Sequence, residues 1–176
     1  MDLTLIIASV VLALTAAYTD IRWGKIFNVI TVPFALLGLT LNTFAGGLEG
    51  LLLSLGGIGA GFALWFVSNF LGRILGGGDI KLLMAFGALM GPAFMLWTFG
   101  IGAVVGGVMA VAVALKQGLL GKVFRQMGTT IYMRAKFSEP MEITDGAGEI
   151  RLPYAIALGL GALITIGARM WSGGGV

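Results

Sequence analysis

Asp20 and Asp79 are the residues of this sequence best placed for chemistry. Asp20 follows the first apolar run, within residues 18–25, and Asp79 ends the glycine-rich stretch 76–79. The chain has no His and no Cys, which excludes imidazole bases, thiol nucleophiles and the usual zinc ligand sets. Its chemistry therefore depends on carboxylates, hydroxyls or Lys, and no metal site is expected.

A pair of carboxylates at one membrane depth would share a proton. If the first and fourth membrane spans are neighbours, Asp20 and Asp79 converge, and in a low-dielectric site one of the two pKa values rises. Such a pair supports general acid and base catalysis through an activated water, as in aspartic proteases. Taken singly, Asp20 also reads as a juxtamembrane charge paired with Arg22 or Lys25, and Asp79 as an incidental acid in a flexible loop.

The glycines in front of Asp79 suggest a loop that another chain can approach. Three consecutive glycines permit unusual backbone angles and close contact, and they discourage regular helix. We expect Gly76 and Gly78 to let this segment approach an extended substrate. Lys81 has two interpretations, orienting Asp79 or contacting a lipid phosphate, and the second is favoured.

The composition requires a membrane. Of the 176 residues, 58% are hydrophobic and 11% are charged, and the mean hydropathy is +1.00, so the chain cannot surround a soluble core with polar surface. One crossing takes about 20 residues, so we expect a single membrane domain over residues 1–176. The N-terminus lacks the basic region and cleavage site of a signal peptide, so the first apolar run should stay as a helix.

The apolar runs predict an all-α, polytopic transmembrane bundle of about six spans. The uncharged stretch 82–115 would extend about 51 Å as one helix, so it should form two spans with a turn near Gly91 and Pro92 or near Gly100. Continuous rather than alternating runs argue against strands. Single helices are predicted at residues 3–19, 29–44, 51–71 and 152–168. Pairs of small residues that predict close helix packing are Gly57 with Gly61 and Gly102 with Gly106.

The basic residues predict the orientation. Ten of the eleven Lys and Arg residues fall in the odd-numbered loops, which the positive-inside rule makes cytoplasmic. Asp20 and Asp79 then lie on the cytoplasmic side and both termini outside. This pattern explains the charge without a nucleic-acid partner, and none is expected. The ten residues are Arg22, Lys25, Arg73, Lys81, Lys116, Lys122, Arg125, Arg134, Lys136 and Arg151.

The long fifth loop predicts a basic amphipathic helix on the inner leaflet, in contact with membrane lipids. A solvated connector is the alternative, and residues 139–149 should form an acidic polar loop. The apolar residues at helical spacing are Leu119, Leu120, Val123, Phe124 and Met127, interleaved with Lys122 and Arg125.

Three motifs in this order resemble those of the prepilin peptidases. They are Asp20 with its following basic residues, the G-x-G-D stretch 76–79 followed by Lys81, and Leu-Pro-Tyr-Ala at 152–155. Although presenilin-type proteases use a similar G-x-G-D element, order and length most resemble the short form found with tight-adherence pilus systems. The resemblance implies a cofactor-free aspartyl endopeptidase of the bacterial inner membrane. Asp20 and Asp79 would cut a pilin precursor at the cytoplasmic membrane face, before its hydrophobic helix.

Two departures from the family pattern bear on the details. The family often has Ile-Pro-Asn where this chain has Ile26, Phe27 and Asn28, which affects the local turn. The Cys-containing cytoplasmic insert of longer members is missing, so methyl transfer is not expected. Two other classes stay open: a small transporter whose acids bind a cation, and a non-catalytic scaffold for secretion or pilus assembly. No acid lies mid-span as the first requires, and the second needs neither aspartate.

Overall fold

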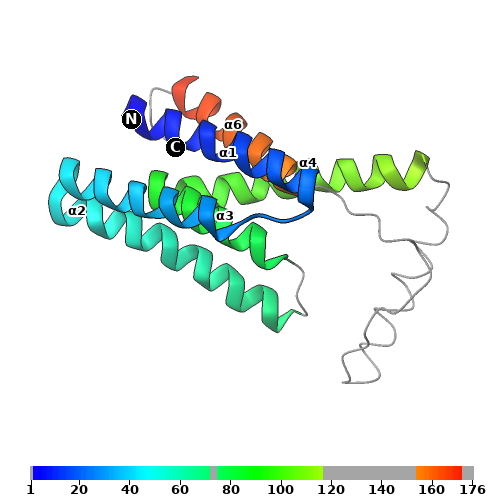
Figure 1. Ribbon diagram of the computed structural model, residues 1–176, viewed down its shortest axis with the longest axis horizontal. Coiled ribbons are helices and arrows are strands. Elements are labelled where there is room, and N and C mark those ends of the chain that lie inside the picture. Colours follow the sequence, from blue (N-terminus) through cyan, green and yellow to red (C-terminus); the bar gives the residue numbers. More distant parts are fainter. Residues whose placement is uncertain (1, 72–74, 117–153, 172–176) are drawn as a thin grey trace. The chain divides into compact units, whose positions relative to one another are not determined.

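The computed structural model describes residues 2–71, 75–116 and 154–171. These form five helices, α1 (Leu3–Trp23), α2 (Asn28–Phe70), α3 (Gly77–Met90), α4 (Pro92–Lys116) and α6 (Tyr154–Trp171), shown in Figure 1. No strand occurs among these residues, so the predicted all-α class is confirmed. The predicted amphipathic helix of the fifth loop and the acidic loop at 139–149 lie outside the described residues.

The chain divides into two compact units, residues 1–106 with 153–176 and residues 107–152. Of the second unit, the structure describes the end of α4, residues 107–116. The arrangement discussed below belongs to the first unit. The expectation of a single domain over residues 1–176 stays a prediction.

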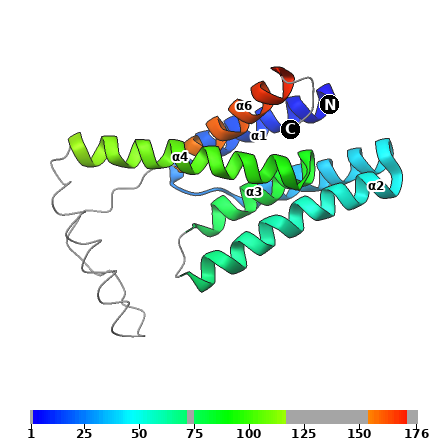
Figure 2. The ribbon, with the colours of Figure 1, turned by 180° about the vertical axis from the view of Figure 1, so that it is seen from behind.

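Four helices within the described ranges are long and apolar enough to cross a membrane: α1, α2, α4 and α6. Six spans are therefore not confirmed. Two of the predicted spans lie within α2, which bends at Gly47, where φ is +56°. The two arms of α2 run side by side (Figures 1 and 2), and Asn42 Nδ2 of the first arm donates to Ser54 Oγ of the second at 2.9 Å. Helix α3 has 14 residues and is about 21 Å long, short of a hydrocarbon core of about 30 Å.

Helix α3 ends at the predicted break before Pro92. Gly91 has a φ of +86°, which an L side chain rarely adopts, and Pro92 starts α4. The carbonyls of the last turn would be costly to leave unpaired in an apolar setting. Side chains of α2 bind two of them: Asn42 Nδ2 donates to Ala88 O and Leu89 O at 3.1 Å, and Ser54 Oγ donates to Ala88 O at 2.8 Å. Helix α3 can therefore stop inside the protein.

The predicted small-residue contacts are confirmed. Gly57 packs against the backbone of Gly87, and a Cβ on Gly61 would lie 2.6 Å from Met84 Cγ, so α2 and α3 pack closely. On α4, Gly102 packs against Leu158 of α6 in the same way. Backbones can approach this closely only where side chains are absent.

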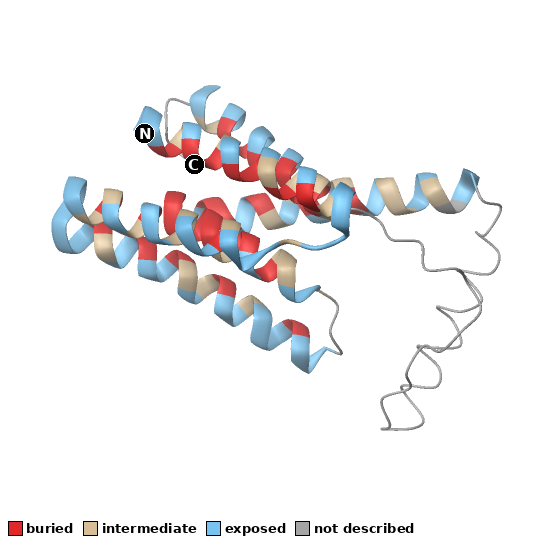
Figure 3. Ribbon diagram, viewed as in Figure 1, coloured by how far each residue is buried: buried red, intermediate tan, exposed pale blue. Residues whose placement is uncertain are grey.

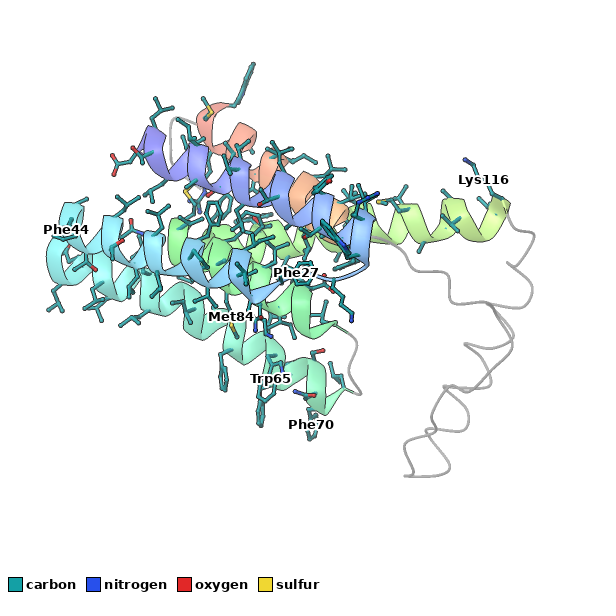
Figure 4. The ribbon with its side chains drawn as sticks, in the orientation of Figure 1. Phe27, Phe44, Trp65, Phe70, Met84 and Lys116 are labelled. Carbon is teal, nitrogen blue, oxygen red and sulfur yellow. The ribbon has the colours of Figure 1, made fainter. Side chains whose placement is uncertain are left out.

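The buried residues lie on the facing sides of the helices, as the colours of Figure 3 show. Large apolar residues are exposed on the outside. Phe44 is 90% exposed and Phe70 is 85% exposed, and Phe70 and Trp65 point away from the bundle in Figure 4. An apolar exterior of this kind fits a lipid solvent. The largest fully buried apolar side chains are Phe86, Phe94, Leu12, Leu82, Leu83, Leu89, Met95 and Leu158.

Candidate active site

Asp20 lies in the last turn of α1 and is held by the start of α6. Helix α1 ends at Gly24, whose φ of +63° closes the helix and lets its N–H donate to Asp20 O at 2.8 Å. The half-buried side chain of Asp20 accepts the backbone N–H of Ala155 through Oδ2 at 2.9 Å. A helix N-terminus has free N–H groups and a positive dipole end. The first turn of α6 therefore stabilises negative charge on Asp20.

Asp79 lies in the first turn of α3, two residues after its start, and its carboxylate accepts the backbone N–H of Gly76. This bond resembles the part of a capping box in which an acidic side chain returns to the residue before the helix. The prediction of a loop over residues 76–79 is wrong in part, because Gly77 and Gly78 are helical. The capping bond and the packing of α3 outweigh the low helix propensity of glycine.

The two carboxylates interact. Burial is the largest cause that raises the pKa of Asp79 from 3.8 to about 6, and the negative charge of Asp20 is the second. The N–H of Gly76 opposes both by lowering this pKa. Asp79 lies outside the four helices that are long enough to span a membrane. The structure thus places Asp20 and Asp79 near enough for one charge to disfavour the other.

The glycines at 76 and 78 provide room rather than unusual backbone angles. A Cβ on Gly76 would lie 2.8 Å from Asp79 Oδ2, and a Cβ on Gly78 would lie 3.2 Å from Ile26 Cβ. A Cβ on Gly77 would meet no described atom within 4 Å. Positive φ values occur elsewhere among the described glycines, at 24, 47 and 91. Close approach at positions 76 and 78 therefore explains those two glycines.

Lys81 binds a residue of α2 in the structure, and its two predicted roles, orienting Asp79 and contacting a lipid phosphate, stay predictions. Its Nζ donates to Asn28 Oδ1 at 2.9 Å, which ties the start of α3 to the start of α2. Ile26 packs against Gly78 in the same region. The segment 26–28, where the sequence departs from the family pattern, thus supports the first turn of α3. The interpretation of Asp20 as a juxtamembrane charge paired with Arg22 or Lys25 finds no support, because the described contacts include no such ion pair.

Two residues of α6 belong to the site without having been assigned a role from the sequence. Ala155 is fully buried and binds Asp20 through its N–H. Tyr154 is half-buried, and the charge of Asp79 acts on its phenol. Both belong to the Leu-Pro-Tyr-Ala motif. This motif pointed to the first turn of α6 as part of the family pattern, but it did not predict the contacts of these two residues. Leu152 and Pro153 lie outside the described residues.

A cavity of about 430 Å³ opens at the other end of the bundle. Asp2 and Leu5 at the start of α1 line it, as do Asn42, Pro92 and Arg169. It lies at the start of α1 and the end of α3, whereas Asp20 and Asp79 lie at the opposite ends of those helices. The predicted site residues are not part of its lining. Across the described ranges, no three Asp or Glu residues gather as a metal site would require.

An all-α, multi-pass membrane protein with two interacting carboxylates is thus the class that the fold and the site define. Residues 6–111 match the model of the type IV leader peptidase family, and the match covers more than half of the chain. The chain therefore belongs to the type IV leader peptidase family and is a membrane peptidase. Asp20, Gly76, Gly78, Asp79 and Lys81 lie within the matched residues. No curated protein and no solved structure matches the chain.

Proposed function

We propose that this protein is an aspartyl endopeptidase that removes the leader peptide of a pilin precursor, with Asp20 and Asp79 as its catalytic pair. The observation that supports this proposal best is the coupling of the two carboxylates, in which Asp20 helps to raise the pKa of Asp79 to about 6. Family membership supports peptide hydrolysis in general. Two coupled acids near neutral pH are suited to that reaction without a metal or a cofactor.

The two carboxylates take different roles in this mechanism. Asp20, whose Oδ2 accepts the Ala155 N–H, is the ionised partner and takes a proton from water as the water oxygen bonds to the peptide carbonyl carbon. Asp79, with its raised pKa, starts protonated and gives its proton to the leaving nitrogen as the carbon–nitrogen bond breaks. Transfer of the proton from Asp20 to Asp79 restores the pair. One water is consumed, and a carboxylic acid and an amine are formed.

The substrate reaches the pair from the cytoplasmic side of the inner membrane. The basic residues of the odd-numbered loops support this orientation, and the exposed Gly76 leaves the start of α3 open to an extended chain. A pilin precursor presents such a chain next to an apolar helix, and membrane lipids surround both. Because the chain lacks the insert of longer family members, cleavage is not followed by methyl transfer.

The test is cleavage of a pilin precursor in liposomes by Asp20→Asn, Asp79→Asn and the double variant, at matched concentrations of folded protein. Because the pair acts as one unit, each single variant should lose nearly all activity and the double variant should be hardly slower. Glu49→Gln, at an exposed acid near the bend of α2, should cleave normally. A labelled methyl donor in the same assay should leave the product unmethylated. Substantial activity in either single variant would exclude the aspartyl mechanism.

A further inference from the structure

The first turn of α6 lies against the carboxylate pair. The hydrogen bond from Ala155 N to Asp20 Oδ2, 2.9 Å long, fixes the start of this helix beside one acid. Tyr154 is the preceding residue, and its phenol lies within electrostatic reach of Asp79. Tyr154 is thus next to the residue that binds one acid and close to the other.

The ring of Tyr154 packs closely against Gly106 of α4. A Cβ on Gly106 would lie 2.6 Å from Tyr154 Cε2 and 3.2 Å from Cδ2, so the ring fills space that a larger residue would occupy. The hydroxyl group has no hydrogen-bond partner among the described residues. A tyrosine whose ring is packed usually finds a partner for its O–H. Here the phenol keeps a donor available next to the pair.

The proposed reaction needs such a donor. When water adds to the peptide, the carbonyl oxygen becomes negatively charged, while the proton of Asp79 is required by the leaving nitrogen. A donor directed at the developing charge lowers the barrier, and a neutral phenol supplies one O–H without changing the charge of the site.

We propose that the Tyr154 hydroxyl donates a hydrogen bond to the carbonyl oxygen of the scissile peptide, from the first turn of α6. Tyr154 is then a third catalytic residue. This inference rests on the proposed function, because it assumes hydrolysis by Asp20 and Asp79. The hydroxyl keeps its proton throughout, so the balance of the reaction is unchanged.

The test is the Tyr154→Phe variant, which keeps the ring on Gly106 and removes the donor. We expect kcat for precursor cleavage to fall about 100-fold, the loss typical of one oxyanion donor, with KM unchanged. A residue that only packs would leave kcat as it is. Tyr18→Phe, which removes the hydroxyl of an exposed tyrosine on α1, is the matched control and should cleave normally.

A second variant displaces the same donor without removing it. In Gly106→Ala the added Cβ pushes the ring from its place, so kcat should fall although the hydroxyl is present. Gly100→Ala, on the same helix with no described atom within 4 Å of the added Cβ, should have normal kcat. Unchanged kcat, or a rise in KM alone, in Tyr154→Phe would overturn the inference. Inactive Asp20→Asn and Asp79→Asn would then leave the proposed function standing, whereas active ones would overturn both.

Discussion

Two helix pairs each present one carboxylate, and they are held together differently. In the pair α2–α3, buried polar side chains and glycine contacts join the helices, with Asn42 and Ser54 bound to the end of α3. In the pair α1–α6, a Cβ added to Gly159 would meet Ala13 at an ordinary contact distance of 3.6 Å. The side-chain hydrogen bond that joins these two helices is that of Asp20 itself. Asp79 thus belongs to a helix pair that is joined by hydrogen bonds at the end of α3 opposite Asp79. Asp20, by contrast, is both a reactive group and a hydrogen-bonded link between α1 and α6.

Asp79 and Asp20 are therefore positioned by different contacts. Asp79 depends on the space that Gly76 leaves and on the Gly76 N–H, both local to the first turn of α3. Asp20 depends on α6, which follows it by 135 residues in the chain. Changes near Asp79 should therefore act mainly on chemistry, while changes at the far end of α3 should act on stability alone.

The largest effect expected in a test of this comparison is that of Gly76→Ala. The added Cβ would lie 2.8 Å from Asp79 Oδ2, so the carboxylate has to move away from its place beside Asp20. A displacement of about 1 Å in a catalytic group costs on the order of 100-fold in rate. The measurement is kcat for precursor cleavage. Gly77→Ala adds the same methyl group where no described atom lies within 4 Å, and it should cleave normally. Equal losses in both variants would show that backbone freedom, rather than room for the carboxylate, is what these glycines provide.

A smaller effect is expected from pH. Because Asp79 acts as the acid and its pKa is about 6, its protonated fraction falls about fivefold between pH 6 and pH 7, and kcat should fall with it. The folded-state pKa lies above the ordinary value of 3.8, so the contribution of Asp79 to stability is complete below pH 3.8 and is lost as the pH rises through about 6. The loss is at most about 3 kcal/mol.

Thermal unfolding in detergent between pH 4 and pH 8 measures this loss. The wild-type protein should lose stability across that range relative to Asp79→Asn, whose neutral side chain does not titrate. Parallel curves for the two proteins would show that Asp79 is not buried near a second charge. In that case the two helix pairs would not bring their acids together.

The sequence predicted the helices and the two acids, because apolar runs of span length and charged residues at their ends are local signals. It could not decide between a break at Pro92 and one at Gly100, since the end of α3 depends on Asn42 and Ser54 reaching carbonyls 34 to 47 residues away. The helical state of Gly77 and Gly78 was missed for a related reason, because capping and packing overrode propensity. Tyr154 was recognised as part of a motif, but its role depends on Gly106 and Asp79, which only the fold brings near it.

The smallest effect on activity, with a clear effect on stability, is expected from Asn42→Ala. This change removes donors to Ser54 Oγ, Ala88 O and Leu89 O. Ala88 O keeps the Ser54 hydroxyl, but Leu89 O loses the bond from Asn42 in an apolar setting. Hydrogen bonds between membrane helices are worth about 1 kcal/mol each, so we expect a loss of about 1–2 kcal/mol of unfolding free energy, because Ser54 compensates in part.

The measurement is thermal unfolding in detergent together with precursor cleavage well below the unfolding temperature. Thr40→Val is the matched control, since the Thr40 hydroxyl on the same arm donates to carbonyls of its own helix, Leu36 O and Leu37 O, and should be nearly neutral. Normal cleavage by folded Asn42→Ala is expected, because Asn42 acts at the far end of α3 and Asp79 at its start. A loss of cleavage without a loss of stability would contradict the comparison, since it would mean that the far end of α3 controls the position of Asp79. The hydrogen bonds of Asn42 would then position the carboxylate pair for catalysis as much as Gly76 does.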